Sequence, residues 1–379
     1  MIRPILVASL CAACGMPASS AVPWERPGDR DVGRPVLAFL WKKTIIDHRF
    51  DHKPQEFASP LAAPIGSGDG TVYVGSHNGL FVALRARDGR RVWTQKLGSV
   101  SAEPLVDGTT VYVGTDAGEM YALDALTGTV KWQYASKGQV LRAPTPVGDM
   151  LVFASDADRV VAVDRATGKY RWQYERDTPE EFTLHGHAGV AAAKDRLYAG
   201  FGDGHVVALT PAAGEVAWVR SLAGEQRTFV DVDTTPLPHD GVLFAASSSG
   251  GLYALDVADG TEKWHAPGVK GVSHLTLDGG RLYAAAAETG LFVLDLDGHI
   301  LWRQGMIGAG DPARPIVDGM YLFLATSERG LYIIDKRDGA LIESFNPGNG
   351  ISAVPAFDGG NVYFLSNGGI LYAMNVRRF

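Results

Sequence analysis

Short runs of alternating apolar and polar residues recur along this chain at intervals of about 40 residues, and most copies end in tryptophan. The clearest copy extends from Val111 to Trp132 and reads VYVGTDAGEMYALDALTGTVKW. Its two apolar runs have the length of β-strands, and the segments that follow them are rich in Gly, Asp and Thr. In the second segment, Asp124–Gly128, the Asp side chain can accept bonds from the backbone ahead of it, and Gly tolerates a positive φ. The pattern therefore predicts successive antiparallel hairpins.

The repeat occurs eight times. A seventh copy places Phe345 where Trp is expected, and an eighth stops at Asn375 without its last segment. A further short apolar run, usually Pro followed by Asp-Gly, lies ahead of each copy, as in Pro104–Gly108. Each unit therefore has four strands, which predicts the blade of a β-propeller. The remaining copies also end in tryptophan, at Trp93, Trp172, Trp218, Trp264 and Trp302.

The N-terminal part of the chain supplies the strand that the eighth copy lacks. Val36–Trp41 is an apolar run that ends in Trp, so Trp41 becomes the missing signature residue. Residues 36 to 379 number 344, which gives 43 residues for each of eight blades. The sequence therefore predicts an all-β, eight-bladed β-propeller of four-stranded antiparallel blades, whose last blade is closed by an N-terminal strand. Such a closure hides the edges that an open sheet would leave unpaired.

The repeated tryptophans have a structural explanation. The small Ala122 in the copy that ends at Trp132 leaves room for a neighbouring indole, so we expect each Trp to dock between blades. Replacing such a buried Trp by Ala costs roughly 3–5 kcal/mol. These residues are therefore interpreted as blade-docking positions and not as a platform for a sugar or a nucleotide.

The first 35 residues are interpreted as an export signal and a tether. Arg3, the apolar stretch from Ile5 to Ala13 and the small residues that follow form a signal peptide over residues 1–21. Cleavage before Cys14 would leave a lipidated first residue, although Cys11 stands where a bacterial lipobox normally has Leu. Cleavage after Ala21 would instead leave a soluble periplasmic protein. Residues 22–35 are rich in Pro, Gly and charge and predict a tether that leads to the propeller over residues 36–379.

Composition excludes several classes of function. The formal net charge is −7 and no long basic run is present, which argues against nucleic-acid binding. Both cysteines, Cys11 and Cys14, lie in the export segment, so the exported domain has neither a disulfide nor thiol chemistry.

Two resemblances point to known families. The phrase Ala-x-Asp-x-x-Thr-Gly-x-x-x-Trp, as in Ala122–Trp132, resembles the quinoprotein propeller repeat, which occurs in pyrroloquinoline-quinone dehydrogenases and in non-enzymatic relatives. It supports the fold and leaves the function open. More specifically, Asp231–Pro236 resembles the segment that leads into the fifth blade of the BamB family, the lipoprotein subunit of the bacterial outer-membrane β-barrel assembly machinery. Phe182–Gly186 stands where that family carries a Leu-x-Leu-Arg-Gly loop.

The second resemblance implies a docking surface for the periplasmic domains of the barrel insertase. An apolar anchor with a charged rim is typical of such a patch. His185 replaces the family Arg and lacks its permanent charge and bidentate fork, so the contact or the partner must differ there. The alternative is that the two aspartates only cap the turn ahead of Pro236. Carried over by motif position, the candidate partner-binding residues are Phe182, Leu184, His185, Asp231 and Asp233.

Catalytic features are not apparent in the sequence. A quinone dehydrogenase would carry a vicinal cysteine pair over the cofactor, and no cysteine follows residue 14. His185 and His187, with Asp203 or His205 nearby, are a weak signal for a metal. We therefore expect no catalytic residue, no cofactor and no metal site. Polar residues of the innermost strands are instead expected to line a wet central channel, namely Glu103, Arg142, Asp233 and Arg314.

The favoured hypothesis is a non-enzymatic scaffold of the β-barrel assembly machinery on the periplasmic face of the bacterial outer membrane, held there by a lipid on Cys14. Its partner would be the barrel insertase, and unfolded outer-membrane protein precursors are a second candidate partner through strand addition. The alternatives are a periplasmic quinoprotein-like dehydrogenase or ligand-binding propeller, and a scaffold of another envelope complex.

Overall fold

The computed structural model describes residues 35–47, 56–63, 70–176, 188–224, 229–287, 289–305 and 309–378. The predicted signal peptide with Cys14 and most of the predicted tether lie outside the described residues, as do Phe182, Leu184 and His185. In the described ranges, no helix is long and apolar enough to cross a membrane.

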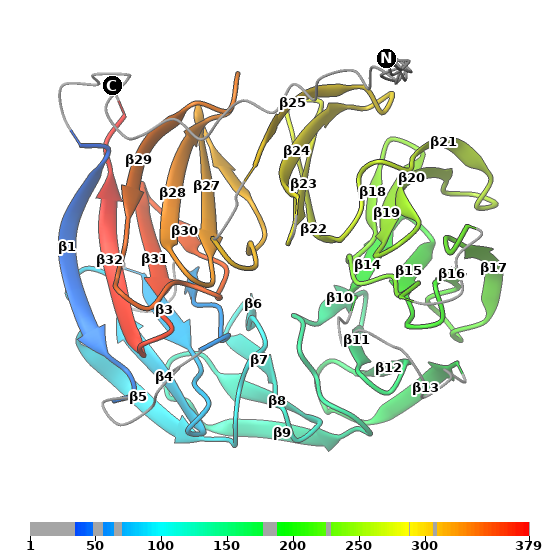
Figure 1. The fold of residues 1–379 in the computed structure, drawn as a ribbon. Coiled ribbons are helices and arrows are strands. Elements are labelled where there is room, and N and C mark those ends of the chain that lie inside the picture. Colours follow the sequence, from blue (N-terminus) through cyan, green and yellow to red (C-terminus); the bar gives the residue numbers. More distant parts are fainter. Residues whose placement is uncertain are drawn as a thin grey trace, which may run out of the picture.

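The described residues form eight antiparallel sheets of four strands each, arranged in a ring (Figure 1). The prediction of an all-β, eight-bladed propeller is confirmed. Blade 1 consists of β2 (Leu61–Ala63), β3 (Thr71–Val74), β4 (Leu80–Arg85) and β5 (Arg91–Lys96), and blade 2 of β6 (Leu105–Asp107), β7 (Thr110–Gly114), β8 (Glu119–Asp124) and β9 (Val130–Ala135). Blade 3 consists of β10 (Thr145–Val147), β11 (Met150–Ser155), β12 (Arg159–Asp164) and β13 (Tyr170–Glu175), and blade 4 of β14 (Val190–Ala193), β15 (Arg196–Gly200), β16 (His205–Leu209) and β17 (Val216–Ser221).

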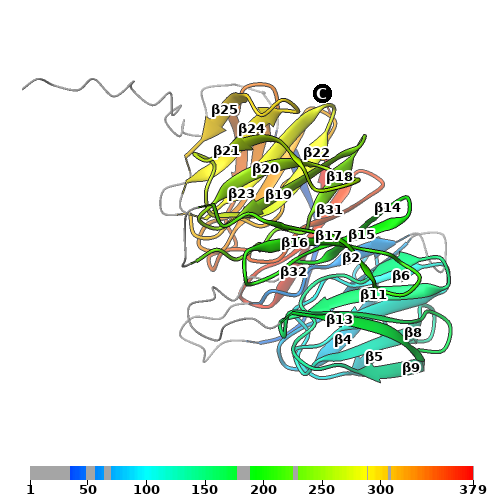
Figure 2. The same ribbon diagram turned by 90° about the vertical axis from the view of Figure 1, so that its right-hand side faces the viewer.

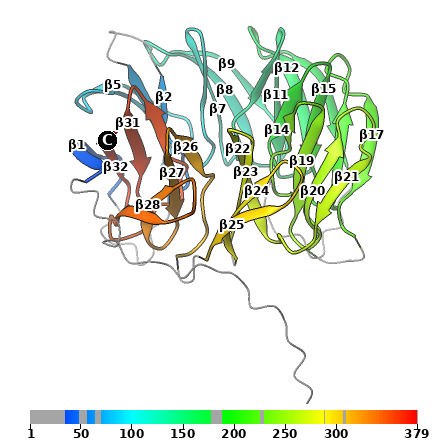
Figure 3. The ribbon, with the colours of Figure 1, turned by 90° about the horizontal axis from the view of Figure 1, so that it is seen from above.

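Blades 5 to 8 follow in the same direction around the ring. The first strand of each blade lies toward the centre and the fourth lies on the rim, as Figures 1 and 3 show. Blade 5 consists of β18 (Leu237–His239), β19 (Val242–Ser247), β20 (Gly251–Asp256) and β21 (Glu262–Ala266), and blade 6 of β22 (Val272–Asp278), β23 (Arg281–Ala286), β24 (Gly290–Asp295) and β25 (Ile300–Gln304). Blade 7 consists of β26 (Ile316–Asp318), β27 (Tyr321–Thr326), β28 (Gly330–Asp335) and β29 (Leu341–Phe345), and blade 8 of β30 (Ala356–Asp358), β31 (Asn361–Leu365), β32 (Ile370–Val376) and β1 (Leu37–Thr44).

The turn between the third and fourth strands shows why the repeat has its Asp and Gly. In blade 2, Asp124 Oδ1 accepts bonds from the amides of Leu126 and Thr127 and from the Thr127 hydroxyl. Gly128 then takes a φ of 73°, a conformation that costs other residues about 1–2 kcal/mol. The turn brings Trp132 opposite the small Ala122 of β8, next to a β-bulge.

Each signature Trp lies against the turn of the next blade. A Cβ added to Gly168 of blade 3 would come within 2.6 Å of the Trp132 ring, so only Gly leaves room for the indole. The Trp132 indole nitrogen also donates to the Arg165 carbonyl at 3.0 Å. Indole donation to the next blade recurs for Trp41, Trp93, Trp172, Trp218 and Trp264, whereas Trp302 packs on Gly339 and its nitrogen has no bond partner among the described residues.

Blade 7 differs from the expectation at its signature position. Glu343, and not Phe345, pairs with Ile333 in the register that places Trp132 opposite Ala122. The assignment of Phe345 was wrong because it followed the nearest aromatic residue instead of the distance from the turn glycine. Phe345 instead contacts the rings of Phe364 and Tyr372 in blade 8.

The ring closes in blade 8 with the predicted N-terminal strand. β1 pairs antiparallel with β32, from Leu37 opposite Val376 to Thr44 opposite Ile370. Figure 1 shows the two strands side by side, and Figure 2 shows the same ring from a second direction. Glu343 Oε2 accepts bonds from the amides of Val36 at 2.5 Å and Leu37 at 3.2 Å. A carboxylate therefore holds the incoming strand at the one junction that lacks a signature Trp.

Candidate functional site

The segment that leads from blade 4 into blade 5 contains both aspartates of the predicted docking surface. Asp231 is only 1% exposed, and Asp233 is half-buried. The expectation that Asp231 belongs to an exposed patch therefore does not fit its burial. The cause is the neighbouring Val232, which packs against Gly200 of blade 4 and draws this part of the backbone between the two blades.

Both blades hold this segment through hydrogen bonds. From blade 5, the Ser247 hydroxyl donates to the Val230 carbonyl at 2.8 Å, and the Ser248 amide donates to the Asp231 carbonyl at 2.9 Å. From the segment, the Val232 amide donates to the Phe201 carbonyl of blade 4 at 3.1 Å. The segment is thus a fixed part of the junction between blades 4 and 5.

The threonines that follow complete this attachment. Thr234 is fully buried, and its hydroxyl oxygen accepts a bond from the Ala246 amide at 2.9 Å. The hydroxyl oxygen of Thr235 accepts a bond from the Gly189 amide of blade 4 at 2.8 Å. The Asp-x-Asp-Thr-Thr sequence therefore encodes a structural junction, whether or not a partner docks beside it.

Asp233 has an unusual electrostatic environment. Burial is the main reason why the pKa of its carboxyl is raised to about 6; the charge of Asp231 adds to the rise, while the hydrogen bond from Ser248 and the charge of Arg142 oppose it. The Ser248 hydroxyl donates to Asp233 Oδ2 at 2.9 Å. A carboxyl with this pKa changes its charge near neutral pH, which ordinary aspartates do not do.

The four polar residues expected in the central channel form one charged group. Arg314 Nη2 of blade 7 donates to both carboxylate oxygens of Glu103 in blade 2, at 3.1 and 2.9 Å. Because these blades are not neighbours in the ring, the ion pair crosses the channel. Arg142 interacts electrostatically with Asp233, Arg314 and Glu103, and burial is the main cause that lowers its pKa.

A cavity of about 540 Å³ lies at this charged group. Its lining includes Glu103, Arg142 and His274, together with several serines of the innermost segments. Burial, and then the charges of Arg142 and Arg314, hold the pKa of His274 well below its usual value, so this imidazole is neutral. Opposite charges compensate each other within the group of Glu103, Arg142, Asp233 and Arg314, while the cavity lining also includes Asp116 and Asp311.

Phe229 is an exposed apolar residue at the blade 4–5 junction, and the sequence interpretation missed it. Its side chain is 46% exposed, although it is a large apolar ring. Its φ of 55° lies in the left-handed region, which bulky residues rarely adopt. It lies two positions before Asp231, and no sequence motif marks its exposure or its backbone conformation.

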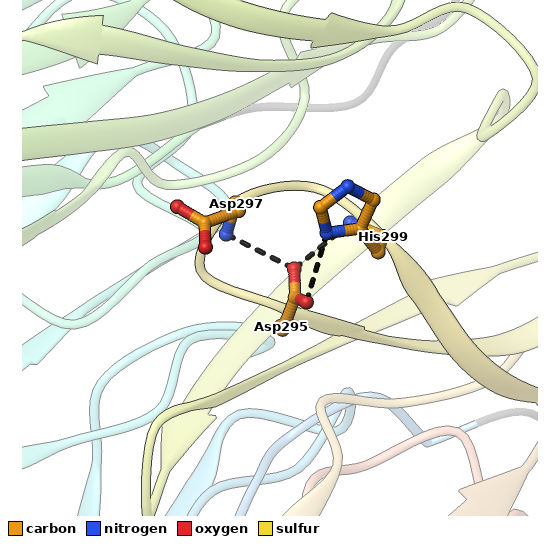
Figure 4. A group of neighbouring side chains, drawn as sticks. All are labelled: Asp295, Asp297 and His299. Atoms are coloured by element: carbon orange, nitrogen blue, oxygen red, sulfur yellow. Dashed lines mark hydrogen bonds and ion pairs between the residues drawn. The ribbon is translucent and has the colours of Figure 1, made fainter.

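Within the part of the chain that the structure describes, one group of side chains has the composition of a metal site. Asp295, Asp297 and His299 lie together on the exposed turn between β24 and β25 (Figure 4). Their contacts are those of a turn: Asp295 Oδ1 accepts bonds from the amides of Asp297 and His299, and His299 Nδ1 lies 3.0 Å from Asp295 Oδ2. Asp295 therefore has the same capping role as Asp124 in blade 2.

The weaker metal hypothesis involved Asp203 and His205. Asp203 Oδ2 accepts bonds from Nε and Nη2 of Arg176, at 2.8 and 2.5 Å. Its other oxygen accepts a bond from the His205 amide at 3.2 Å. Asp203 thus joins blade 3 to blade 4, while His185 and His187 lie outside the described residues.

Comparison with known proteins identifies the family of the chain, which the geometry of the site alone does not. The sequence profile of the family described as outer membrane protein assembly factor BamB matches residues 38–135, 86–298 and 293–378. The chain belongs to this family. BamB of Escherichia coli (strain K12) is 37% identical over 253 residues, which cover 62% of this chain and 64% of that protein. The chain thus matches somewhat less than two thirds of the length of its BamB relative.

Solved structures agree with the propeller fold. BamB from Moraxella catarrhalis has a TM-score of 0.74 at 21% identity, covering 90% of this chain and 100% of that chain. A quinohemoprotein alcohol dehydrogenase from Pseudomonas putida has a TM-score of 0.69 at 17% identity, covering 90% and 76%. At these identities the likeness shows the fold alone, and both BamB and an enzyme share it. The family assignment therefore rests on the sequence match.

Proposed function

We propose that this BamB-family protein is a non-enzymatic scaffold of the outer-membrane β-barrel assembly machinery and docks on the periplasmic domains of the barrel insertase. The observation that carries the proposal is the BamB family match, which extends with overlaps from residue 38 to residue 378. The relatives are named as assembly factors and not as enzymes. The protein would act on the periplasmic side of the outer membrane, held there by a lipid on Cys14.

The blade 4–5 junction is the part of the propeller that we propose as the docking surface. Phe229 offers an exposed apolar anchor, and the hydrogen bonds from Ser247 and Ser248 fix the backbone on its C-terminal side. Asp231 and Asp233 then act by positioning this segment, because Asp231 is buried. A preorganised anchor loses little conformational entropy on binding, which favours affinity. Phe182, Leu184 and His185 are proposed to belong to the same surface.

Binding of the purified periplasmic domains of the insertase to the full-length protein tests this proposal. We expect Phe229→Asn to weaken binding about tenfold or more, since it removes the anchor while Asn tolerates the left-handed backbone. Tyr170→Asn is the matched control, because Tyr170 is an exposed aromatic residue on the outer strand β13 of blade 3. The control variant should bind like the original protein.

A positioning role of the aspartates predicts a different signature. Asp231→Ala with Asp233→Ala should weaken insertase binding and also lower the melting temperature, whereas Phe229→Asn should leave the melting temperature nearly unchanged. If the original protein does not bind the insertase but recovers another envelope protein after cross-linking, the assignment to the β-barrel assembly machinery is wrong and the propeller serves a different complex.

A further inference from the structure

The N-terminal strand enters the propeller beside the C-terminal end of the chain, as Figure 1 shows. β1 pairs antiparallel with β32, and the Arg377 amide donates to the Val36 carbonyl at 2.8 Å. The chain advances 21 positions from the predicted lipid site Cys14 to Pro35, so this segment can span at most about 70 Å. A lipid on Cys14 would therefore keep the start of β1 within this distance of the membrane surface.

Two adjacent apolar side chains are exposed near the start of β1. Phe39 is 59% exposed and Leu40 is 44% exposed. A bulge between Phe39 and Trp41 interrupts the alternation of the strand, so both side chains can point outward while Trp41 is buried. Adjacent exposed apolar residues of this size are candidates for contact with an apolar partner.

The turn of blade 1 between β4 and β5 lies beside this pair. Trp41 packs on Gly89 of the turn, and its indole nitrogen donates to the Ala86 carbonyl at 2.8 Å. The segment Arg85–Arg91 contains four arginines and one aspartate, so its formal charge is +3 in a chain whose net charge is −7. The exposed apolar pair therefore has a strongly basic neighbour.

A single carboxylate is shared among these arginines. The Nε atoms of Arg85, Arg87 and Arg90 lie 3.5, 3.8 and 3.6 Å from oxygens of Asp88. The side chains of Arg87 and Arg90 are 59% and 75% exposed. Exposed guanidinium groups that share one carboxylate keep a net positive charge and hydrogen-bond donors for a further anion.

Other basic residues surround the same pair. Lys42 and Lys43 follow it in β1, and Arg377 and Arg378 follow β32. Lys42, Arg377 and Arg378 are exposed, and Arg378 forms an ion pair with Asp318. The name basic sector is used below for Phe39, Leu40, Lys42, Arg87, Arg90 and Arg377.

Blade 6 has an equivalent apolar pair without basic surroundings. Ile300 and Leu301 of β25 directly precede Trp302, and they are 49% and 47% exposed. The turn of blade 7 on which this Trp packs, Asp335–Gly339, contains two basic and two acidic residues, so its formal charge is zero. An exposed apolar pair and a basic turn thus coincide at the start of β1 and not in blade 6.

We propose that the basic sector binds the surface of an anionic phospholipid bilayer. Its arginines would bind lipid phosphates, while Phe39 and Leu40 would enter the boundary between headgroups and acyl chains. A lipid anchor combined with a basic patch holds a protein on a membrane more stably than either signal alone. The inference rests on the proposed place of this protein at the periplasmic face of the outer membrane.

The basic sector and the proposed docking surface lie on opposite sides of the ring. In a ring of eight blades, the junction of blades 8 and 1 is opposite the junction of blades 4 and 5. Figure 1 shows β1 at one side of the ring and β17 at the other. The bilayer and the insertase would therefore contact different parts of the propeller, and both contacts can exist at once.

Co-sedimentation with lipid vesicles tests the inference without the lipid anchor. Residues 22–379 contain all 32 strands of the ring, so this form replaces the lipidated protein. Vesicles of phosphatidylglycerol and phosphatidylethanolamine are compared with vesicles of phosphatidylcholine alone. We expect binding to the anionic vesicles that weakens with added salt, and binding about tenfold weaker to the neutral vesicles. Equal binding to both kinds of vesicle would contradict the proposed role of the arginines.

The apolar pair has a matched control in blade 6. Phe39→Ser with Leu40→Ser should weaken binding to the anionic vesicles about tenfold, since it removes the apolar contact and leaves every charge in place. Ile300→Ser with Leu301→Ser should leave binding within about twofold. Equal loss in the two double variants, or unchanged binding in the first, would overturn the proposal.

The basic turn has a matched control in blade 3. Arg90→Gln should weaken binding about fivefold, and Arg90→Lys, which keeps the charge, should restore most of it. Lys169 follows the turn glycine of blade 3 as Arg90 follows that of blade 1, and Lys169→Gln should have an effect below about twofold. Equal losses in Arg90→Gln and Lys169→Gln would show that the net charge of the whole protein governs binding, which contradicts a specific sector.

Two further outcomes separate this inference from others. If the protein binds neither kind of vesicle but sediments as a dimer that Phe39→Ser with Leu40→Ser abolishes, the occupant is a second copy of this chain and the bilayer assignment is wrong. Insertase binding is measured in parallel and should be unchanged in every variant. Loss of vesicle binding with intact insertase binding supports the inference, whereas vesicle binding without insertase binding contradicts only the proposed docking.

Discussion

The junction between blades 2 and 3 and the junction between blades 7 and 8 meet the same geometric requirement with different chemistry. At the first, Trp132 fills the space above Gly168 and donates one hydrogen bond to Arg165. At the second, Glu343 has the Trp position and accepts bonds from the amides of Val36 and Leu37. The first junction is mainly apolar, and the second depends on a carboxylate.

The chain connectivity explains this difference. In blades 1 to 7 a tight turn joins the third strand to the fourth, and its glycine provides a flat surface for the preceding indole. In blade 8 the fourth strand is β1, from the other end of the propeller, so no such turn joins it to β32. The first amides of β1 need an acceptor there, and a carboxylate supplies one. The presence of a signature Trp therefore depends on the turn glycine that lies opposite it in the next blade.

The largest effect is expected from Trp132→Ala. The variant removes a buried indole from the apolar junction and should lower the free energy of unfolding by roughly 3–5 kcal/mol. Guanidinium unfolding followed by circular dichroism measures this loss. A loss below about 1 kcal/mol would contradict the view that indole packing stabilises this junction.

A smaller loss should follow Gly168→Ala. The new Cβ would lie 2.6 Å from the Trp132 ring, and the residue has a φ of 70°. Steric overlap and backbone strain together should cost about 2–3 kcal/mol. The matched control is Gly148→Ala, whose φ is 59° but whose Cβ would meet nothing within 4 Å. Equal losses in the two variants would show that backbone conformation, and not contact with Trp132, requires the glycine.

Glu343→Ala tests the polar junction. Two amides of the incoming strand would lose their acceptor, which should cost about 1–3 kcal/mol, and Glu343→Gln should cost less because it keeps a carbonyl oxygen. Hydrogen exchange should show faster exchange in β1 and no change in blades 2 to 4. Glu343→Trp should not restore stability, since no turn glycine of blade 8 lies opposite the new indole. Full stability in that variant would contradict this explanation of the difference between the two junctions.

The smallest effect is expected at the surface of the same closure. Arg378 Nη2 contacts both carboxylate oxygens of Asp318 at 2.7 and 2.9 Å, but the Arg side chain is 64% exposed. Arg378→Ala should therefore change the free energy of unfolding by about 0–1 kcal/mol, and less at high salt. A double-mutant cycle with Asp318→Ala measures the pair directly. A coupling above about 2 kcal/mol would assign part of the closure to this ion pair as well.

The candidate site was only partly predictable from the sequence. The family loop identified Asp231 and Asp233 because its residue order is distinctive, but Val232 packs between the blades and buries Asp231. Phe229 has no motif around it, and its exposure becomes apparent only in the folded propeller.

The fold of this protein follows from the local pattern of its sequence. The spacing of Asp, Gly and Trp is a local property of each hairpin, and its repetition predicted the four-stranded blades, their number and the closure by Val36–Trp41. The contacts between side chains of different blades become apparent only in the folded molecule: the ion pair of Glu103 with Arg314, and the hydrogen bonds of Glu343 to the first strand. Such contacts join residues far apart in the chain, and their geometry depends on how all eight blades pack around one axis.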